Sequence, residues 1–118
     1  MDKIYKESLM LDFYGQFLTK RQYEIMDMYL NNNYSLSEIA ECAKISRQGV
    51  HDNIKRARNL FNSFEQKLGL VKNFSKKKSD CEKILNCLKS IQKEKVPYEV
   101  NNILREIKVT TLNIIKDE

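Results

Sequence analysis

Apolar residues recur along this 118-residue chain at steps of three and four, which is the spacing of amphipathic helices. Strands are not expected, because the chain shows no sustained alternation of apolar and polar residues. The pattern predicts four helices in the first part of the chain, over 3–14, 19–31, 35–43 and 46–69. The predicted fold class is therefore all-α.

Local capping signals mark where these helices begin and end. Thr19–Gln22 and Ser35–Glu38 both have the capping-box pattern, in which a hydroxyl and a side chain three residues later satisfy free backbone N–H groups. Ser46 is expected to cap the fourth helix. Gly69 supplies its end, because glycine adopts left-handed backbone angles without strain.

The lysine-rich last third predicts two further helices. Ser79–Glu82 has a third capping-box pattern, which favours a helix that starts at Ser79. The alternative is a start near Leu70, since Val71 and Phe74 extend the same apolar stripe. Pro97 is expected to open the final helix. We divide the chain into a domain over 1–70 and a helical extension over 71–118.

Charge is distributed unevenly over the chain, whose formal net charge is +5. Residues 1–43 carry four basic and seven acidic side chains. Residues 44–67 carry six basic and two acidic side chains, and residues 68–118 carry eleven basic and seven acidic ones. The first third would repel a phosphate backbone, whereas the fourth helix and the extension would attract one. No apolar run is long enough for a membrane span, and the charged N-terminus does not resemble a signal peptide, so a cytoplasmic protein without membrane contact is expected.

Residues 36–56 have the pattern of a helix-turn-helix. Ala40 is small enough for two helices to cross closely, and Ile45, Val50 and Ile54 would fill the angle between them. Lys44 occupies a turn position that is commonly glycine, so it should adopt positive φ at a cost of about 1 kcal/mol, unless the turn has another shape.

The outer face of the fourth helix then carries the candidate nucleic-acid contacts, which are Arg47, Gln48, His51, Lys55 and Arg58. The first residues of a recognition helix meet base edges, where arginine pairs with guanine and glutamine with adenine. Lys55 and Arg58 lie further along and would meet phosphates. Gly49 would let the helix backbone come close to a bound molecule, and Asp52 would oppose phosphate. The competing interpretation is a packing unit whose charged face is only solvated.

No catalytic, metal or cofactor site is expected from the sequence. The single histidine, His51, falls on the outer face without partner ligands, and the three cysteines do not have metal-ligand spacing. Cys42 and Cys81 occupy positions where small apolar residues would pack, so both are interpreted as core residues. A glycine-rich phosphate loop is absent as well, which argues against an enzyme.

Several segments in order resemble the YlxM-like family of small bacterial helix-turn-helix proteins, whose gene lies beside those of the signal recognition particle. The segments are Leu11–Gly15, Leu18–Gln22, Ser35–Ala40, Ile45–Val50 and Glu65–Leu70, so the resemblance covers about residues 5–71. The same region is similar to region 4 of bacterial sigma factors. That similarity implies that Arg47, Gln48, His51 and Lys55 occupy recognition-helix positions.

Two functions remain open at this point. The leading hypothesis is a non-catalytic regulatory protein that binds DNA or structured RNA and that, by the family resemblance, acts in the signal recognition particle pathway. The alternative is a protein-interaction module that uses the helix-turn-helix as a scaffold, with acidic early helices facing a basic partner from the targeting machinery. The two C-terminal helices would pack on the earlier helices or pair with a second copy as a homodimer.

Overall fold

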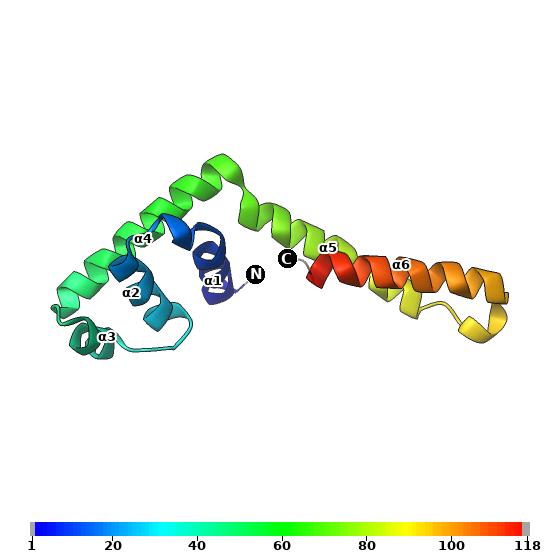
Figure 1. The fold of residues 1–118 in the computed structure, drawn as a ribbon, viewed down its shortest axis with the longest axis horizontal. Helices are drawn as coiled ribbons and strands as arrows, with labels where there is room; N and C mark the ends of the chain where they lie inside the picture. The colour runs from blue at the N-terminus through cyan, green and yellow to red at the C-terminus, as the bar shows by residue number, and fades with distance from the viewer. Residues whose placement is uncertain (1, 117–118) are drawn as a thin grey trace. The chain divides into compact units, whose positions relative to one another are not determined.

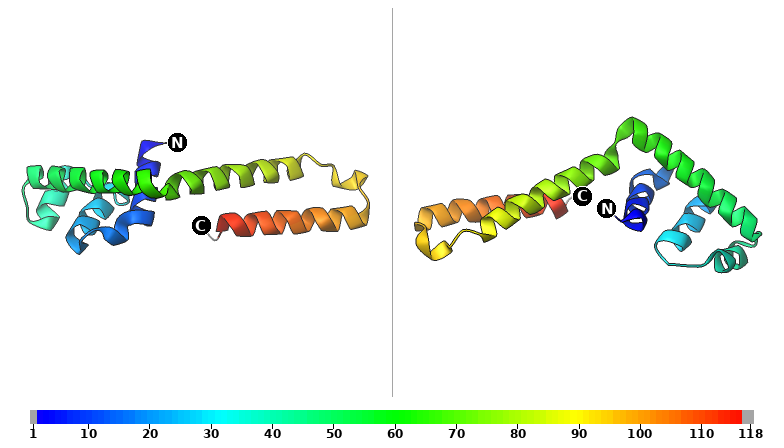
Figure 2. Two further views of the ribbon diagram at one scale, coloured as in Figure 1. Left: turned by 90° about the horizontal axis from the view of Figure 1, so that it is seen from above. Right: turned by 180° about the vertical axis from the view of Figure 1, so that it is seen from behind.

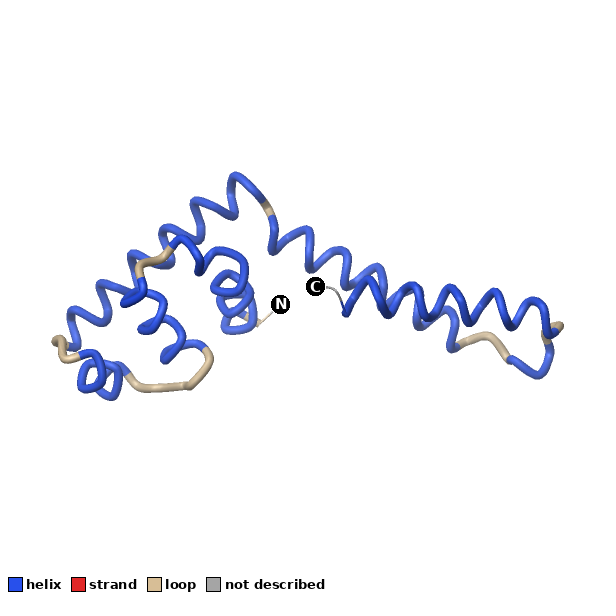
Figure 3. The backbone as a smooth tube through the Cα atoms, in the orientation of Figure 1, coloured by secondary structure: helices blue, strands red, loops and turns tan. Residues whose placement is uncertain are grey.

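The computed structural model describes residues 2–116, which form α-helices and two short 3₁₀ helices without a strand in that range (Figures 1 and 3). The elements are α1 (Lys3–Tyr14), η1 (Gly15–Phe17), α2 (Lys20–Leu30), α3 (Leu36–Ala43), α4 (Arg47–Leu68), α5 (Leu70–Lys89), η2 (Lys93–Lys95) and α6 (Tyr98–Lys116). The predicted all-α fold is confirmed. The chain divides into a first unit that ends at Val71 and a second unit that begins at Lys72.

The predicted caps of the first unit are present. At the start of α2, the Gln22 amide donates to the Thr19 hydroxyl (3.2 Å) and the Thr19 amide donates to the Gln22 side chain (2.9 Å). Ser35 and Glu38 form the same reciprocal pair at the start of α3. Gly69 ends α4 with a φ of 63°, in the left-handed region. These caps fix the helix ends locally, because each needs only residues within four positions.

The third capping box, at Ser79–Glu82, is not formed, because that segment lies inside α5. The alternative start at Leu70 is the correct one. The first N–H groups of α5 find side-chain acceptors outside the helix instead: the Leu70 amide donates to the Tyr14 hydroxyl (3.2 Å) and the Val71 amide donates to Glu65 (3.0 Å). Asp80 pairs with Lys76 one turn earlier on the exposed side of the same helix (3.1 Å).

In the first unit, α1, α2 and α3 all lie along one side of the long helix α4 (Figures 1 and 2). The α4 residues that face them are buried, namely Val50, Ile54, Ala57 and Phe61. Leu68, in the last turn of α4, is 51% exposed. Fully buried side chains from the other helices, such as Tyr14, Met26 and Ile39, complete the core. The packing holds the start of α4 in a fixed position relative to α3.

The second unit is an antiparallel pair of helices, α5 and α6, joined by a loop that contains η2 (Figure 2). Cys81 and Thr111 are its buried residues. The side-chain amide of Asn101 donates to the Lys93 carbonyl (3.1 Å), which ties the start of α6 to the loop. Much of the apolar surface of α6 stays exposed. None of the helices described within residues 2–116 is both long and apolar enough to cross a membrane.

Candidate nucleic-acid interface

The turn between α3 and α4 has the glycine-type geometry that the sequence predicts for Lys44. This lysine has φ 58° and ψ 44°, in the left-handed region. Its backbone N–H and that of Ile45 both donate to the Ala40 carbonyl, the latter at 3.1 Å, which closes the end of α3. These two hydrogen bonds hold the turn in place, although the left-handed backbone conformation of Lys44 costs about 1 kcal/mol.

The first turn of α4 is capped by Ser46, whose hydroxyl accepts from the Gly49 amide at 3.0 Å. A Cβ atom on Gly49 would lie 3.2 Å from that hydroxyl and 3.5 Å from the Ile45 side chain. The sequence-based interpretation that Gly49 gives room to a bound molecule therefore needs correction. The space beside this glycine is filled by the protein's own cap.

The two helices of the motif interlock largely through the residues that the sequence indicates. Ala40 of α3 and Val50 and Ile54 of α4 are buried together with Ile39, whereas Ile45 of the turn is half-buried. Ala40 keeps the helices close, since a larger side chain there would separate them. This core fixes which side of α4 faces outward.

Four of the predicted contact residues lie exposed on the outward side of α4, namely Arg47, Gln48, His51 and Lys55. Two of them approach Asp52. The Gln48 side-chain amide donates to Asp52 Oδ1 at 3.0 Å, and His51 Nδ1 lies 3.8 Å from the same oxygen. To present its amide to a base, Gln48 would have to leave this carboxylate.

Arg47 and Lys55 are the predicted contact cations that remain available. Neither has a hydrogen-bond or ion-pair partner among the residues that the structure describes. Arg47 is the first residue of α4, where the backbone N–H groups add attraction for an anion. Lys55 follows about two turns later. The exposed face thus offers an arginine, a lysine and a helix N-terminus to a polyanion.

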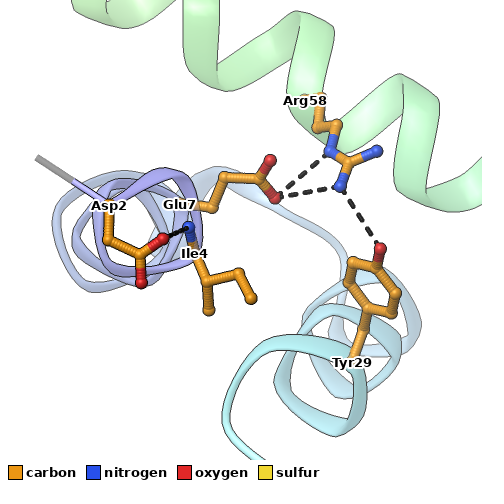
Figure 4. Close-up of polar contacts among 5 residues, drawn as sticks. All are labelled: Asp2, Ile4, Glu7, Tyr29 and Arg58. Carbon is orange, nitrogen blue, oxygen red and sulfur yellow. Dashed lines mark hydrogen bonds and ion pairs between the residues drawn. The ribbon is translucent and has the colours of Figure 1, made fainter. Parts of the chain in front are cut away.

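Arg58 has a different position from the other four. Its Nε and Nη2 atoms donate to Glu7 Oε2 of α1 at 3.2 and 3.1 Å, and Nη2 donates to the Tyr29 hydroxyl of α2 at 3.5 Å (Figure 4). The guanidinium also lies over the Tyr29 ring, 5.5 Å from its centre. The expectation of a phosphate contact treated Arg58 as free on the outer face, and we correct it: Arg58 joins α4 to α1 and α2.

The electrostatics of Arg58 agree with this role. Desolvation disfavours its charge, but the hydrogen bonds to Glu7 and Tyr29 outweigh it, so the pKa of Arg58 lies above its ordinary value. The Glu7 side chain is 15% exposed, so the ion pair is shielded on its acidic side. Shielded pairs of this kind contribute more than fully exposed ones.

A further arginine was missed by the sequence analysis. Arg21, in the first turn of α2, donates from Nη2 to the Ala43 carbonyl at the end of α3 (2.5 Å). It therefore brings a positive charge next to the turn that leads into α4. No pattern in the sequence indicates this bond, because its partners are 22 residues apart.

Comparison with known proteins agrees with this geometry. A family described as "Putative helix-turn-helix protein, YlxM / p13 like" matches residues 1–103. The chain belongs to this YlxM/p13-like family. It is 51% identical over 116 residues to a UPF0122 protein of Acetivibrio thermocellus, which covers 98% of this chain and 99% of the relative.

Two other YlxM/p13-like relatives extend the comparison. A UPF0122 protein of Thermoanaerobacter sp. (strain X514) is 44% identical over 100 residues, covering 85% of this chain and 86% of the relative. A UPF0122 protein of Oceanobacillus iheyensis is 36% identical over 107 residues, which cover 91% of this chain and 98% of the relative. The family match runs well past residue 71, where the recognised segments end, and so includes α5 and the start of α6.

The cysteines of this YlxM/p13-like chain occupy two kinds of position. Cys81 is buried, as predicted, whereas Cys42 is exposed, so its interpretation as a core residue was wrong. The buried side of α3 is formed by Ile39 and Ala40, and Cys42 falls on the other side of the helix. Among the described residues, histidine, cysteine and acidic side chains form no group of three that could hold a metal ion.

Proposed function

We propose that this protein is a non-catalytic regulatory protein of the cytoplasm that binds nucleic acid through the start of α4. The observation that carries the proposal is the exposed pair Arg47 and Lys55 on the outward side of the second helix of the motif. Membership of a family described as helix-turn-helix supports the same interpretation. In such motifs the N-terminal part of the second helix enters the major groove.

The test is fluorescence anisotropy with a labelled mixed-sequence DNA duplex and a labelled RNA hairpin, over a series of salt concentrations. Binding should weaken as salt rises, because phosphate contacts release counterions. Arg47→Ala and Lys55→Ala should each weaken binding several-fold, and Lys55→Ala should reduce the salt slope by about one. The two probes distinguish DNA from RNA as the target.

Lys67→Ala is the matched control for Lys55→Ala. Lys67 lies in the last turn of the same helix and is exposed, so the same charge is lost far from the proposed interface. Its affinity should stay within twofold of the wild type. Equal weakening by both lysine variants, or weak binding that neither outward-facing variant alters at low salt, would refute the proposed interface.

We further propose that the regulatory role belongs to the signal recognition particle pathway, as the family resemblance implies. The experiment is capture of purified targeting GTPase and its RNA by the immobilised full chain, with and without nuclease. Capture that depends on the RNA supports nucleic-acid binding in this pathway. Capture of the GTPase alone, unaffected by nuclease, instead favours the protein-interaction module.

A homodimer through α6 is the third part of the proposal. Val100, Ile103, Ile107 and Ile114 are all exposed, and with Thr110 they follow the alternating three- and four-residue spacing of a coiled-coil seam. Ile103 is 58% exposed, so Ile103→Glu should leave the fold intact and shift the mass measured by light scattering to the monomer. Val109→Glu is the control, because Val109 is 51% exposed but lies off the seam, and this variant should leave the measured mass unchanged.

A further inference from the structure

The second unit contains an apolar groove that its own helices leave open. The groove has a volume of about 410 Å³ and is lined by residues of α5, α6 and the loop between them. Leu85, Leu88, Ile91 and Leu104 are half-buried along its floor, and Leu112 extends the floor at 44% exposure. None of the five seam residues of α6 lines it. The groove is therefore a separate surface from the proposed dimer seam.

The rim of the groove is basic. Lys89, Lys93, Arg105 and Lys108 line it and are all exposed, and no acidic residue is among the lining residues. Within residues 2–116, none of these four cations takes part in an ion pair. A ligand that fills the groove must therefore cover its apolar side chains and carry negative charge next to the basic rim.

We propose that this groove docks an amphipathic helix with acidic flanks from a partner protein. A helix laid between two antiparallel helices completes a three-helix bundle, and its apolar residues at steps of three and four would meet the leucines of the floor. Its acidic side chains would meet the rim, where Arg105 and Lys108 stand one turn apart on α6.

Two other occupants fit less well. Nucleic acid would satisfy the rim but would gain nothing from the leucine floor, because its outer surface is a phosphate backbone. A second copy docked groove to groove would bring its own Lys89, Lys93, Arg105 and Lys108 against this rim. Like charges brought together at an interface oppose association.

The length of the groove sets the size of the ligand. The residues of α6 that line the groove run from Tyr98 to Leu112, fourteen positions apart, which is roughly 21 Å along a helix axis. The probe is a fluorescein-labelled designed peptide of roughly 18 residues, about five turns, with leucines on one face and glutamates beside them. One control peptide replaces the glutamates with lysines, and a second replaces the leucines with glutamines.

Binding of each peptide to the full chain is measured by fluorescence anisotropy. The acidic leucine peptide should bind, and both control peptides should bind at least about tenfold more weakly, because each lacks one of the two complementary features. Equal binding of the lysine peptide would overturn the proposal. So would displacement of the acidic peptide by an excess of mixed-sequence duplex DNA.

The groove itself is tested with variants of exposed residues, so that folding is preserved and can be confirmed by circular dichroism. Arg105→Glu combined with Lys108→Glu should weaken binding of the acidic peptide at least about tenfold, and Leu112→Gln several-fold. Lys83→Glu is the matched control, because Lys83 is exposed on α5 but does not line the groove. Equal effects of the rim and control variants would overturn the proposal.

The seam variant Ile103→Glu separates this site from a dimer contact. It should leave the affinity for the acidic peptide within twofold of the wild type, since Ile103 does not line the groove. Loss of peptide binding together with loss of the dimer would show that a second copy forms the site, which would overturn the proposal of a groove within one chain.

Discussion

The hydroxyl of Tyr14 donates a 2.6 Å hydrogen bond to Glu65, which lies 51 residues later in the chain. Tyr14 is fully buried, and its ring stacks on Phe64 at 5.7 Å. The same hydroxyl accepts from the Leu70 amide, and Glu65 accepts from the Val71 amide. One side-chain pair thus joins the end of α1 to the end of α4 and caps the first turn of α5.

Replacement of Tyr14 by phenylalanine should destabilise the protein by about 1–3 kcal/mol, because the Leu70 amide and the Glu65 carboxylate each lose a partner in a part-buried contact. Urea unfolding of the full chain, followed by circular dichroism, measures the change. Tyr34→Phe removes the same atom from an exposed loop residue and should change stability by less than about 0.5 kcal/mol. Equal effects of the two variants would contradict the role given to Tyr14.

Alkaline pH should weaken the same contact. Burial, followed by the hydrogen bond to Glu65, raises the pKa of Tyr14 above its ordinary value of 10.0. The folded state therefore favours the neutral phenol, so this contribution is fully present below about pH 10 and is lost as pH rises through the folded-state pKa.

The measurement for this pH effect is the difference in unfolding free energy between the wild type and Tyr14→Phe. This difference should be constant in neutral solution and should shrink above about pH 10, where the tyrosine of the wild type begins to ionise. The comparison cancels the titration of the other tyrosines and lysines. A difference that stays constant throughout the alkaline range would contradict the raised pKa.

Arg58 is expected to act on stability rather than on nucleic-acid affinity. Arg58→Gln removes the donors to Glu7 and Tyr29 and should lower the free energy of unfolding by about 1–2 kcal/mol. This is the lower end of the range for charged pairs, because water reaches the guanidinium. Arg56→Gln, two positions earlier and exposed, should cost less than about 0.5 kcal/mol. In the anisotropy assay, Arg58→Gln should leave affinity within twofold of the wild type. A fall in affinity with Arg58→Gln similar to that of Lys55→Ala would restore Arg58 to the interface.

The helix ends could be predicted from the sequence because their causes are local. Thr19, Ser35 and Ser46 cap helices through hydrogen bonds to residues three positions later, and these pairs are visible in a single window. The start of α5 at Leu70 could not be decided in this way. It depends on Tyr14 and Glu65, which only the tertiary fold brings together.

The candidate interface was predictable only in part, for the same reason. Helical periodicity placed Arg47 and Lys55 on the outward side of α4, since the buried side was marked by apolar residues. It could not show that Glu7 neutralises Arg58, because those residues are 51 positions apart. The position of Gly49 beside the Ser46 hydroxyl, by contrast, follows from the cap itself, because Gly49 is the third residue after Ser46.

The strained turn at Lys44 is a place where a substitution should raise stability rather than lower it. Lys44→Gly should stabilise the protein by up to about 1 kcal/mol, because the relief of left-handed strain exceeds the entropy that glycine loses on folding. Lys44→Ala keeps a Cβ atom at the same φ of 58° and should not stabilise it. Urea midpoints of the three proteins provide the comparison. A stabilisation by alanine equal to that by glycine would indicate relief of charge rather than of backbone strain.

Asp52 is expected to limit the affinity of the proposed interface. Its carboxylate lies among the outward-facing residues of α4, where it repels phosphate and accepts from the Gln48 amide. Asp52→Asn removes the charge and keeps an acceptor for that bond. We expect a several-fold gain in affinity for nucleic acid at low salt, which shrinks as salt rises because the effect is electrostatic. Asp12→Asn, on the exposed side of α1, removes the same charge elsewhere and is the control. An equal gain with both variants would assign the effect to net charge alone, and no gain with Asp52→Asn would place the phosphate backbone away from this face of α4.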